Sequence, residues 1–420
     1  MSNARNLANL LSPGATTLGS SAIADNAITG AKVVAGALSA ADIEDSSITA
    51  AKLATDSVTT AKIEASAVTT AKIADAAVTS AKALNLGRRN KIINGQYAVA
   101  SRATSFTSTG SANNDAVYTL DRWKLLSDGN DIVDVSQETS TVPTNKLFAL
   151  KLDVETEDKK FGIAQVVENN ACTGLIGNSV TLSFQAKVSD TSKLDNIKCA
   201  IISWSSTADS PTADMISAWG DEGTDPTLAS NFTYENTPAN LNVTTSYAKY
   251  SVTASVDTSS AANVIAFIWS DVTDTTAGHH LFITDVQLEE GSSATDYEQR
   301  AFHEEERDCQ RYYYEIHSAT NYSKFGVGRA WSTDDTAAAL FLPVAMRTTP
   351  SMATSTIGTN FGVAGVGSGI SAITLAERDV NNQLFTINVA YATTSFTTGN
   401  IYQIESNGNT TGFISFDAEI

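Results

Sequence analysis

Cysteine, histidine and long apolar runs are all scarce in this sequence. Its 420 residues include 3 cysteines and 4 histidines. Because Cys172, Cys199 and Cys309 are an odd number without clustered spacing, we expect neither a disulfide framework nor a zinc site. No run approaches the roughly 20 apolar residues of a membrane span, and residues 1–11 lack the apolar stretch of a secretory signal. We therefore expect a protein that is made and folded in a cytosol and does not enter a bilayer.

Basic residues are outnumbered as well. The chain has 27 Lys and Arg against 46 Asp and Glu, which gives a formal net charge of −19. Repulsion from phosphate groups argues against DNA or RNA as the main partner. The hydrophobic content of 42% is nevertheless sufficient for packed cores, and the length has room for two or three domains.

Signatures of catalysis are missing too, since no G-x-S-x-G, H-E-x-x-H or Walker motif is found. His279 and His280 precede a predicted strand and would point to opposite faces, so they cannot bind one metal without distortion. Paired carboxylates for glycoside cleavage are always possible among 46 acidic residues and therefore indicate nothing. We expect no enzymatic activity and no cofactor, although Asp and Asn loops could hold a structural Ca²⁺.

The strongest pattern is a repeat between Ser21 and Leu84. Apolar residues recur at every fifth position, within a unit of ten residues. Five residues rotate an α-helix by about 140°, so these residues would not form a helical stripe, and the period also excludes a heptad coiled coil. In a straight strand, five residues reverse the face, so alternate apolar residues would point to solvent. The apolar positions are Ile23, Ile28, Val33, Leu38, Ile43, Ile48, Leu53, Val58, Ile63, Val68, Ile73 and Val78.

A consistent structure for this repeat has a short extended segment and a turn in each unit, with several chains around one axis. Each chain then contributes one apolar side chain per level to a thin shared core. Three chains enclose a narrow axis most easily, so the repeat predicts a homotrimeric fibrous stalk over 21–84. The alternative is a disordered linker rich in Ala and Thr, which would have no need of a strict apolar period.

Two β-rich regions follow the stalk, so the predicted fold class is all-β. Alternating runs over 85–300 predict seven or more strands separated by turn residues, which is typical of a jelly-roll β-sandwich. A charged segment at 301–316 would link this sandwich to a smaller C-terminal β-domain over 317–420, in which the glycine-rich stretch 360–371 is expected to be a loop. The clearest predicted strands are 146–154, 180–188, 197–204, 247–256, 263–272 and 280–288.

Several motifs resemble one protein family. The opening of the sandwich resembles that of a jelly-roll domain common in bacteriophage tail fibres, through NKIINGQYAVASRATSFTS and YTLDRWKL. The later strands of that domain are similar to FGIAQVVE and ITDVQLEEGSSATDYEQR. The C-terminal domain that often follows it is similar to ERDCQRYYYEI, LPVAMRTTPSM and FISFDAEI, and the repeat resembles the stems of such fibres.

This resemblance implies a homotrimeric virion tail protein that recognises the host. Residues 1–20 would attach to other tail proteins, the stalk would provide reach, and the distal β-domains would contact a receptor on the bacterial surface. Jelly rolls of this kind are similar to carbohydrate-binding modules, which implies a glycan receptor, with a surface protein as the other possibility. The rival functions are a purely structural tail adaptor or spacer, a tail-spike depolymerase and a bacterial surface adhesin.

Aromatic residues in loops are the best candidates for receptor contact, because sugar rings stack on exposed aromatic rings while Asp and Asn bind the hydroxyls. Trp219 lies in a predicted loop beside Asp221, and Trp331 lies near Asp334 in the last domain. We therefore predict ligand binding at these four residues.

The remaining aromatic residues have structural interpretations. Trp204 and Trp269 lie within predicted strands, and Trp123 lies at the start of the sandwich, so we expect all three in the core. The tyrosine run 312–314 predicts an interface between domains or between chains.

Overall fold

The computed structural model describes residues 88–257, 260–375 and 382–420, together with residue 33 and parts of 42–68. The chain divides into two units, 1–84 and 85–420. The predicted attachment segment 1–20 and most of the predicted stalk 21–84 lie outside the described residues. Within the described part, no helix is long and apolar enough to cross a membrane.

The described part of the repeat has turns and exposed apolar side chains. The amide of Lys52 donates to the carbonyl of Thr49 over 2.9 Å, and that of Ser57 donates to Ala54 over 3.0 Å. The short 3₁₀ helix η4 (Ala50–Lys52) belongs to the first turn. Every apolar repeat position that the structure describes is between 37% and 58% exposed in the single chain, and these positions are Val33, Ile43, Ile48, Leu53, Val58, Ile63 and Val68.

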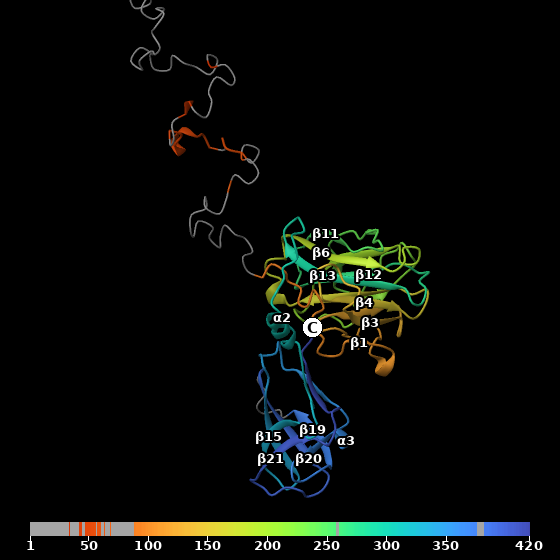
Figure 1. The fold of residues 1–420 in the computed structure, drawn as a ribbon, viewed down its shortest axis with the longest axis vertical. Helices are drawn as coiled ribbons and strands as arrows, with labels where there is room; N and C mark the ends of the chain where they lie inside the picture. Colours follow the sequence, from red (N-terminus) through yellow and green to blue (C-terminus); the bar gives the residue numbers. More distant parts are fainter. Residues whose placement is uncertain are drawn as a thin grey trace, which may run out of the picture. The chain divides into compact units, whose positions relative to one another are not determined.

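Residues 88–300 form a jelly-roll-like β-sandwich of two antiparallel sheets (Figure 1). Sheet A has the strand order β1 (Ser105–Phe106), β3 (Val133–Glu138), β4 (Ala149–Val154), β13 (His280–Glu290), β6 (Ser179–Val188) and β11 (Ala248–Ser255). Sheet B has the order β10 (Phe232–Tyr234), β7 (Ile197–Trp204), β12 (Asn263–Ser270), β5 (Phe161–Val167) and β2 (Lys124–Ser127). The six clearest strands predicted from alternation are confirmed as β4, β6, β7, β11, β12 and β13.

The core between the two sheets follows from period-2 alternation. Val180, Leu182 and Phe184 of β6 are all buried in it, as expected for one face of a strand. Trp123 is fully buried beside Tyr97, with 5.2 Å between their ring centroids, and its indole N–H donates to the carbonyl of Asn94 over 3.0 Å. Trp123 is therefore a core residue, as predicted.

The outer face of sheet B is also apolar and covered. A hairpin of β8 (Ile216–Ala218) and β9 (Thr227–Leu228) belongs to the loop between β7 and β10. A second hydrophobic cluster includes Trp204, Phe267 and Trp269 from this face together with Ile216 and Trp219 from the loop. The burial of Trp204 and Trp269 confirms their predicted core position.

The C-terminal β-domain contains two further sheets and its own core. Sheet D has the order β14 (Tyr313–His317), β22 (Phe413–Asp417) and β17 (Ser351–Thr354). Sheet E has the order β18 (Phe361–Val363), β21 (Ile401–Ser406), β15 (Lys324–Ala330), β16 (Asp335–Phe341), β20 (Leu384–Tyr391) and β19 (Ile370–Leu375), and the short helix α3 (Ile357–Asn360) precedes β18. The glycine-rich stretch 360–371, expected to be a loop, is partly strand, because β18 and the start of β19 lie within it.

The segment 301–316 has more regular structure than a simple linker. It contains the helix α2 (Phe302–Gln310), and β14 begins inside it. Glu304 and Glu305 lie in the first turn of α2, where carboxylates interact favourably with the helix dipole.

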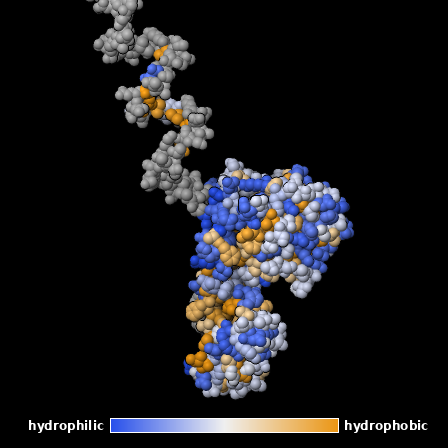
Figure 2. All heavy atoms as spheres, in the orientation of Figure 1, coloured by the Kyte–Doolittle hydropathy of each residue, from blue (hydrophilic) through white to orange (hydrophobic). Residues whose placement is uncertain are grey.

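In Figure 2, the visible surface is mainly hydrophilic or neutral, with hydrophobic residues in several separate patches.

Candidate functional site

The outer face of sheet A is polar, although much of it is buried. The same alternation that directs apolar side chains into the core directs Thr181, Ser183 and Gln185 of β6 outward. Gln287 and Glu289 of β13 pair with β6 on this face and are fully buried. Buried polar groups of this kind need hydrogen-bond partners. The segment 291–300, which follows β13, supplies them.

Hydrogen bonds to Gln287 and Glu289 of β13 hold this segment against the sheet. The amide of Glu298 donates to Gln287 Oε1 over 2.8 Å, and the amide of Thr295 donates to Glu289 Oε1 over 2.8 Å. Gln287 Nε2 donates to Glu289 Oε1 over 2.8 Å and to Thr295 Oγ1 over 3.1 Å. Arg89 Nε lies 3.2 Å from Glu289 Oε2 and balances the buried charge. The segment that carries Tyr297 is therefore fixed in position.

A β-bulge places Asp285 at the centre of the same face. The pairing of β13 with β6 shifts between Thr284 and Gln287, and Asp285 has a left-handed backbone conformation with φ 54°. Such bulges redirect a side chain, and a non-glycine residue at positive φ is a costly conformation that often marks a functional site. Asp285 Oδ1 accepts from Gln96 Nε2 over 2.6 Å, and Oδ2 accepts from Gln185 Nε2 over 2.6 Å and lies 2.8 Å from Lys146 Nζ.

Gly95 allows the chain to approach this bulge. Its carbonyl accepts from the amide of Val286 over 2.9 Å. A Cβ atom at Gly95 would lie 2.2 Å from the carbonyl oxygen of Val286 and 3.2 Å from the hydroxyl of Tyr297. Only glycine fits this position without a shift of the backbone, so Gly95 sets the placement of Gln96 beside Asp285.

Three adjoining hollows lie along this face, and we call them together the sheet A groove. The first, about 270 Å³, and the second, about 330 Å³, share Lys146 and Tyr297 in their walls. The second and the third, about 560 Å³, share Gln185. Lys187 and Tyr247 line the third hollow. Volumes of this order are typical of small-molecule sites.

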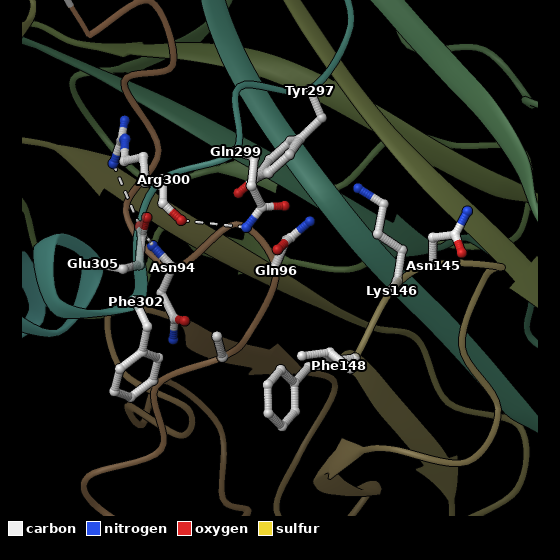
Figure 3. A pocket seen from close by; sticks show the side chains of 12 residues that line it. Asn94, Gln96, Asn145, Lys146, Phe148, Tyr297, Gln299, Arg300, Phe302 and Glu305 are labelled. Atoms are coloured by element: carbon white, nitrogen blue, oxygen red, sulfur yellow. Dashed lines mark hydrogen bonds and ion pairs between the residues drawn. The ribbon is translucent and has the colours of Figure 1, made fainter.

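The first hollow combines aromatic rings with amide groups. Figure 3 shows the rings of Phe148, Tyr297 and Phe302 around it, with Gln96 and Gln299 between them. Phe302, at the start of α2, is exposed, and Phe148 is half-buried. The rings can offer apolar faces, and the amides can both donate and accept hydrogen bonds.

Burial, followed by the nearby charges of Glu305 and Asp285, raises the pKa of Tyr297 well above its ordinary value. The phenol is therefore neutral at physiological pH and keeps its proton to donate. Lys146 Nζ lies 5.2 Å from the centroid of the Tyr297 ring. The Asp285 carboxylate, contacted through both of its oxygens, orients the side chains around it.

The four residues predicted to bind a ligand lie outside the groove. Trp219 is only 8% exposed and packs on Phe267, with 6.2 Å between ring centroids, so it offers little ring face to a ligand. The carbonyls of Trp219 and Asp221 accept from Lys160 Nζ over 3.4 and 2.8 Å. The buried ammonium group of Lys160 therefore fixes the backbone of their loop through these hydrogen bonds. Ligand binding by Trp219 and Asp221 stays a prediction; Asp221 is exposed, whereas the burial of Trp219 leaves little of its ring for stacking.

The other predicted pair lies in the C-terminal domain. Trp331 is 58% exposed and follows β15. The amide of Asp334 donates to the hydroxyl of Ser332 over 3.1 Å, and its carbonyl accepts from the amide of Tyr391 over 2.8 Å. Trp331 and Asp334 therefore remain accessible candidates.

The tyrosine run forms a domain interface, as predicted. The guanidinium carbon of Arg122 lies 3.6 Å from the centroid of the Tyr312 ring, and that of Arg102 lies 3.7 Å from the Tyr313 ring. Tyr312 also donates to Glu168 Oε2 over 2.7 Å. These contacts join the sandwich to the C-terminal domain within one chain.

Histidine and cysteine have no shared site among the described residues. His280 Nε2 lies 3.0 Å from Asp153 Oδ1, whereas His279 Nε2 lies 3.6 Å from Asp190 Oδ2. The three cysteines are buried free thiols. In the part of the chain that the structure describes, no group of three His, Cys, Asp or Glu residues is arranged to hold a metal ion.

Comparisons with known proteins find only distant structural matches. No protein-family model and no curated protein match the sequence. The enzymatically active domain of bacteriophage CBA120 tailspike protein 4 is 16% identical over 48% of this chain, with a TM-score of 0.28, and the match spans 21% of that chain. A putative sugar binding protein from Bacteroides thetaiotaomicron is 14% identical over 48% of this chain and 100% of its own, with a TM-score of 0.28.

A CBM22-1 xylan-binding domain from Paenibacillus barcinonensis Xyn10C is also similar. It is 14% identical over 43% of this chain and 94% of its own, with a TM-score of 0.26. TM-scores this low carry no conclusion about function. The function must therefore be argued from the groove itself.

Proposed function

We propose that this chain is a glycan-binding protein whose sheet A groove binds a saccharide chain without cleaving it. One observation carries the proposal: aromatic rings and side-chain amides line adjoining hollows above a hydrogen-bonded polar floor centred on Asp285. Sugars present apolar ring faces and many hydroxyls, which match rings and amides respectively. The floor is organised before any ligand arrives, so little entropy is lost on binding.

The first experiment measures binding of the full chain to an array of bacterial surface glycans. Phe302→Ala removes an exposed ring from the first hollow and should weaken binding about fivefold, since a stacking contact contributes of the order of 1 kcal/mol. Phe341→Ala is the matched control, because Phe341 is an exposed ring in sheet E. A loss in Phe341→Ala or Trp331→Ala, with no loss in Phe302→Ala, would move the site to the C-terminal domain.

A reducing-sugar assay on the glycans that bind separates binding from cleavage. We expect no release of reducing ends, because the contacts of the Asp285 carboxylate with Gln96, Gln185 and Lys146 give it the role of organising the floor of the groove. Steady release would instead support the depolymerase alternative. A chain that binds no glycan at all would support the purely structural alternative.

We further propose that the chain is the host-recognition protein of a bacteriophage tail fibre and is a homotrimer through 21–84, with 1–20 joined to other tail proteins. The exposure of every described apolar position of the repeat supports this, because a single chain leaves these side chains in water. Light scattering should give three times the chain mass of 44.2 kDa. In such a trimer, three weak sites per fibre would act together through avidity. A chain that stays monomeric with 21–84 intact would contradict the proposal.

A further inference from the structure

We infer that the glycan is acidic, and that one of its carboxylate or phosphate groups binds to Lys187 in the third hollow of the sheet A groove. This inference rests on the proposed function and adds the chemical class of the ligand. Its starting point is the unusual environment of the Lys187 ammonium group.

Lys187 is half-buried and has no acceptor for its three ammonium hydrogens among the described residues. Its Nζ lies 5.6 Å from the centroid of the Tyr247 ring and 5.1 Å from that of Phe282. Every other lysine that the structure describes has a carboxylate or carbonyl acceptor, and these lysines are Lys52, Lys91, Lys124, Lys146, Lys151, Lys159, Lys160, Lys193, Lys198, Lys249 and Lys324.

The contrast is informative because carboxylates are abundant in this chain. With 46 acidic residues against 27 basic ones, a lysine could readily find an acidic partner. On the same face, Lys146 pairs with Asp285 and Lys151 pairs with Asp153, each over 2.8 Å. Lys187 instead stands between two aromatic rings, which hold the ammonium group in place without neutralising its charge.

The remaining walls of the third hollow carry no opposing charge. Lys187 is its only charged side chain, beside the Gln185 amide and the hydroxyl of Ser246. Burial, followed by the nearby charge of Glu138, raises the pKa of Tyr247. Glu138 Oε1 accepts from the amides of Ser140 and Thr141 over 2.5 and 2.8 Å, which holds this carboxylate at the turn that follows β3, and no ion pair joins it to Lys187 among the described residues.

In the second hollow, two lysines, Lys146 and Lys249, are matched by two carboxylates, Asp285 and Asp296, so the unmatched positive charge lies in the third hollow. Lys249 pairs across the strands with Gln185, and its ammonium group donates to the carbonyl of Thr295. A glycan chain along the groove would therefore meet aromatic faces in the first hollow and positive charge in the third. The overall negative charge of the protein repels polyanions, so the attraction must be local and will weaken with added salt.

The test uses an array that displays neutral, uronate-bearing and phosphate-bearing oligosaccharides, probed with the full chain. We expect the strongest binding to acidic glycans. Lys187→Gln should reduce that binding about tenfold, as for loss of one charged hydrogen bond, and leave the binding of neutral glycans unchanged. Lys187→Arg should retain most of it, and the uronate and phosphate members identify which anion is bound.

The matched control is Lys193→Gln, which removes an exposed lysine outside the groove. Preferential binding of neutral glycans, or equal binding of acidic glycans by Lys187→Gln and the unsubstituted chain, would overturn the inference while leaving glycan binding intact. Absence of binding to every glycan would instead overturn the proposed function itself.

Discussion

Lysine residues of this protein occupy contrasting environments, which differ in how many hydrogen-bond acceptors surround the ammonium group. Lys160 is buried and bonded to several oxygens, while Lys187 is half-buried and free for a ligand. Lys124 is buried near the domain interface, with Nζ donating to the carbonyl of Ala213 over 3.1 Å and lying 4.7 Å from the Tyr118 ring centroid. One weak acceptor does not replace the water that the ammonium group has lost.

Lys124 should therefore make stability depend on pH. Burial, with a smaller effect from Arg122, lowers its pKa from 10.5 to about 8. Between these two pH values the unfolded chain binds a proton that the folded chain does not, so stability rises with pH in this window. Below pH 8 the residue lowers the free energy of unfolding by about 3 kcal/mol. Denaturant unfolding from pH 7 to 10.5 measures this contribution.

Lys124→Met removes this contribution. The variant should be more stable than the original chain at pH 7, and the advantage should shrink as the pH approaches 10.5. Lys159→Met, at a partly exposed lysine, serves as the control. If the difference in unfolding free energy between Lys124→Met and the original chain stays constant from pH 7 to 10.5, Lys124 does not titrate as described.

At the scale of elements, a buried lysine organises the loop that contains Trp219. Lys160 Nζ contacts Asp271 Oδ1 over 2.5 Å and the carbonyls of Asp221 and Thr224 over 2.8 and 3.2 Å. Lys198 contacts the other oxygen of Asp271 over 2.8 Å. The ammonium group of Lys160 thus gathers carbonyl groups from one loop around a single positive charge.

Lys160→Met should cost about 3 to 5 kcal/mol of unfolding free energy, because it leaves the Asp271 charge partly unpaired and several carbonyls without a donor. It should also expose Trp219, which tryptophan fluorescence and its quenching by iodide would detect. Lys193→Met, which breaks an exposed pair with Asp274, should cost less than about 1 kcal/mol. Equal losses in the two variants would contradict the role of Lys160.

The sequence predicted the sandwich strands well because alternation is a local property. It did not predict the cover on sheet B, and for that reason it favoured Trp219 as an exposed ring. A signal was present: β7 and β12 are buried along their whole length, and each contains a continuous apolar run, at 199–202 and at 264–269, rather than an alternating one. Such runs are typical of strands covered on both faces.

The β-bulge at the centre of the sheet A groove could also be recognised in the sequence. Leu281 and Ile283 share one phase of alternation with the core, whereas Val286 and Leu288 share the opposite phase. This change of phase at Asp285 indicates a bulge. The hollows themselves could not be predicted, because they depend on segments such as 291–300 that fold back over a distant part of the sheet.

At the scale of the whole described chain, the last residues join the two β-domains. Arg122 is buried, forms an ion pair with Glu419 and donates to the carbonyl of Val166 over 2.7 Å. Arg102 lies 3.0 Å from Asp417 and 3.3 Å from Glu419. The sandwich and the C-terminal domain have separate hydrophobic cores, so these charges and the stacked tyrosines carry much of the coupling between them.

Glu419→Ala should therefore weaken that coupling. It leaves the Arg122 guanidinium buried without its carboxylate, which costs about 3 to 5 kcal/mol. Because the two cores are separate, calorimetry should show one cooperative transition in the original chain and two in the variant. Glu405→Ala, which removes a partner of the more exposed Lys324, should keep the single transition. If Glu419→Ala unfolds in one step at the original temperature, the two domains are coupled by apolar contacts rather than by this buried ion pair.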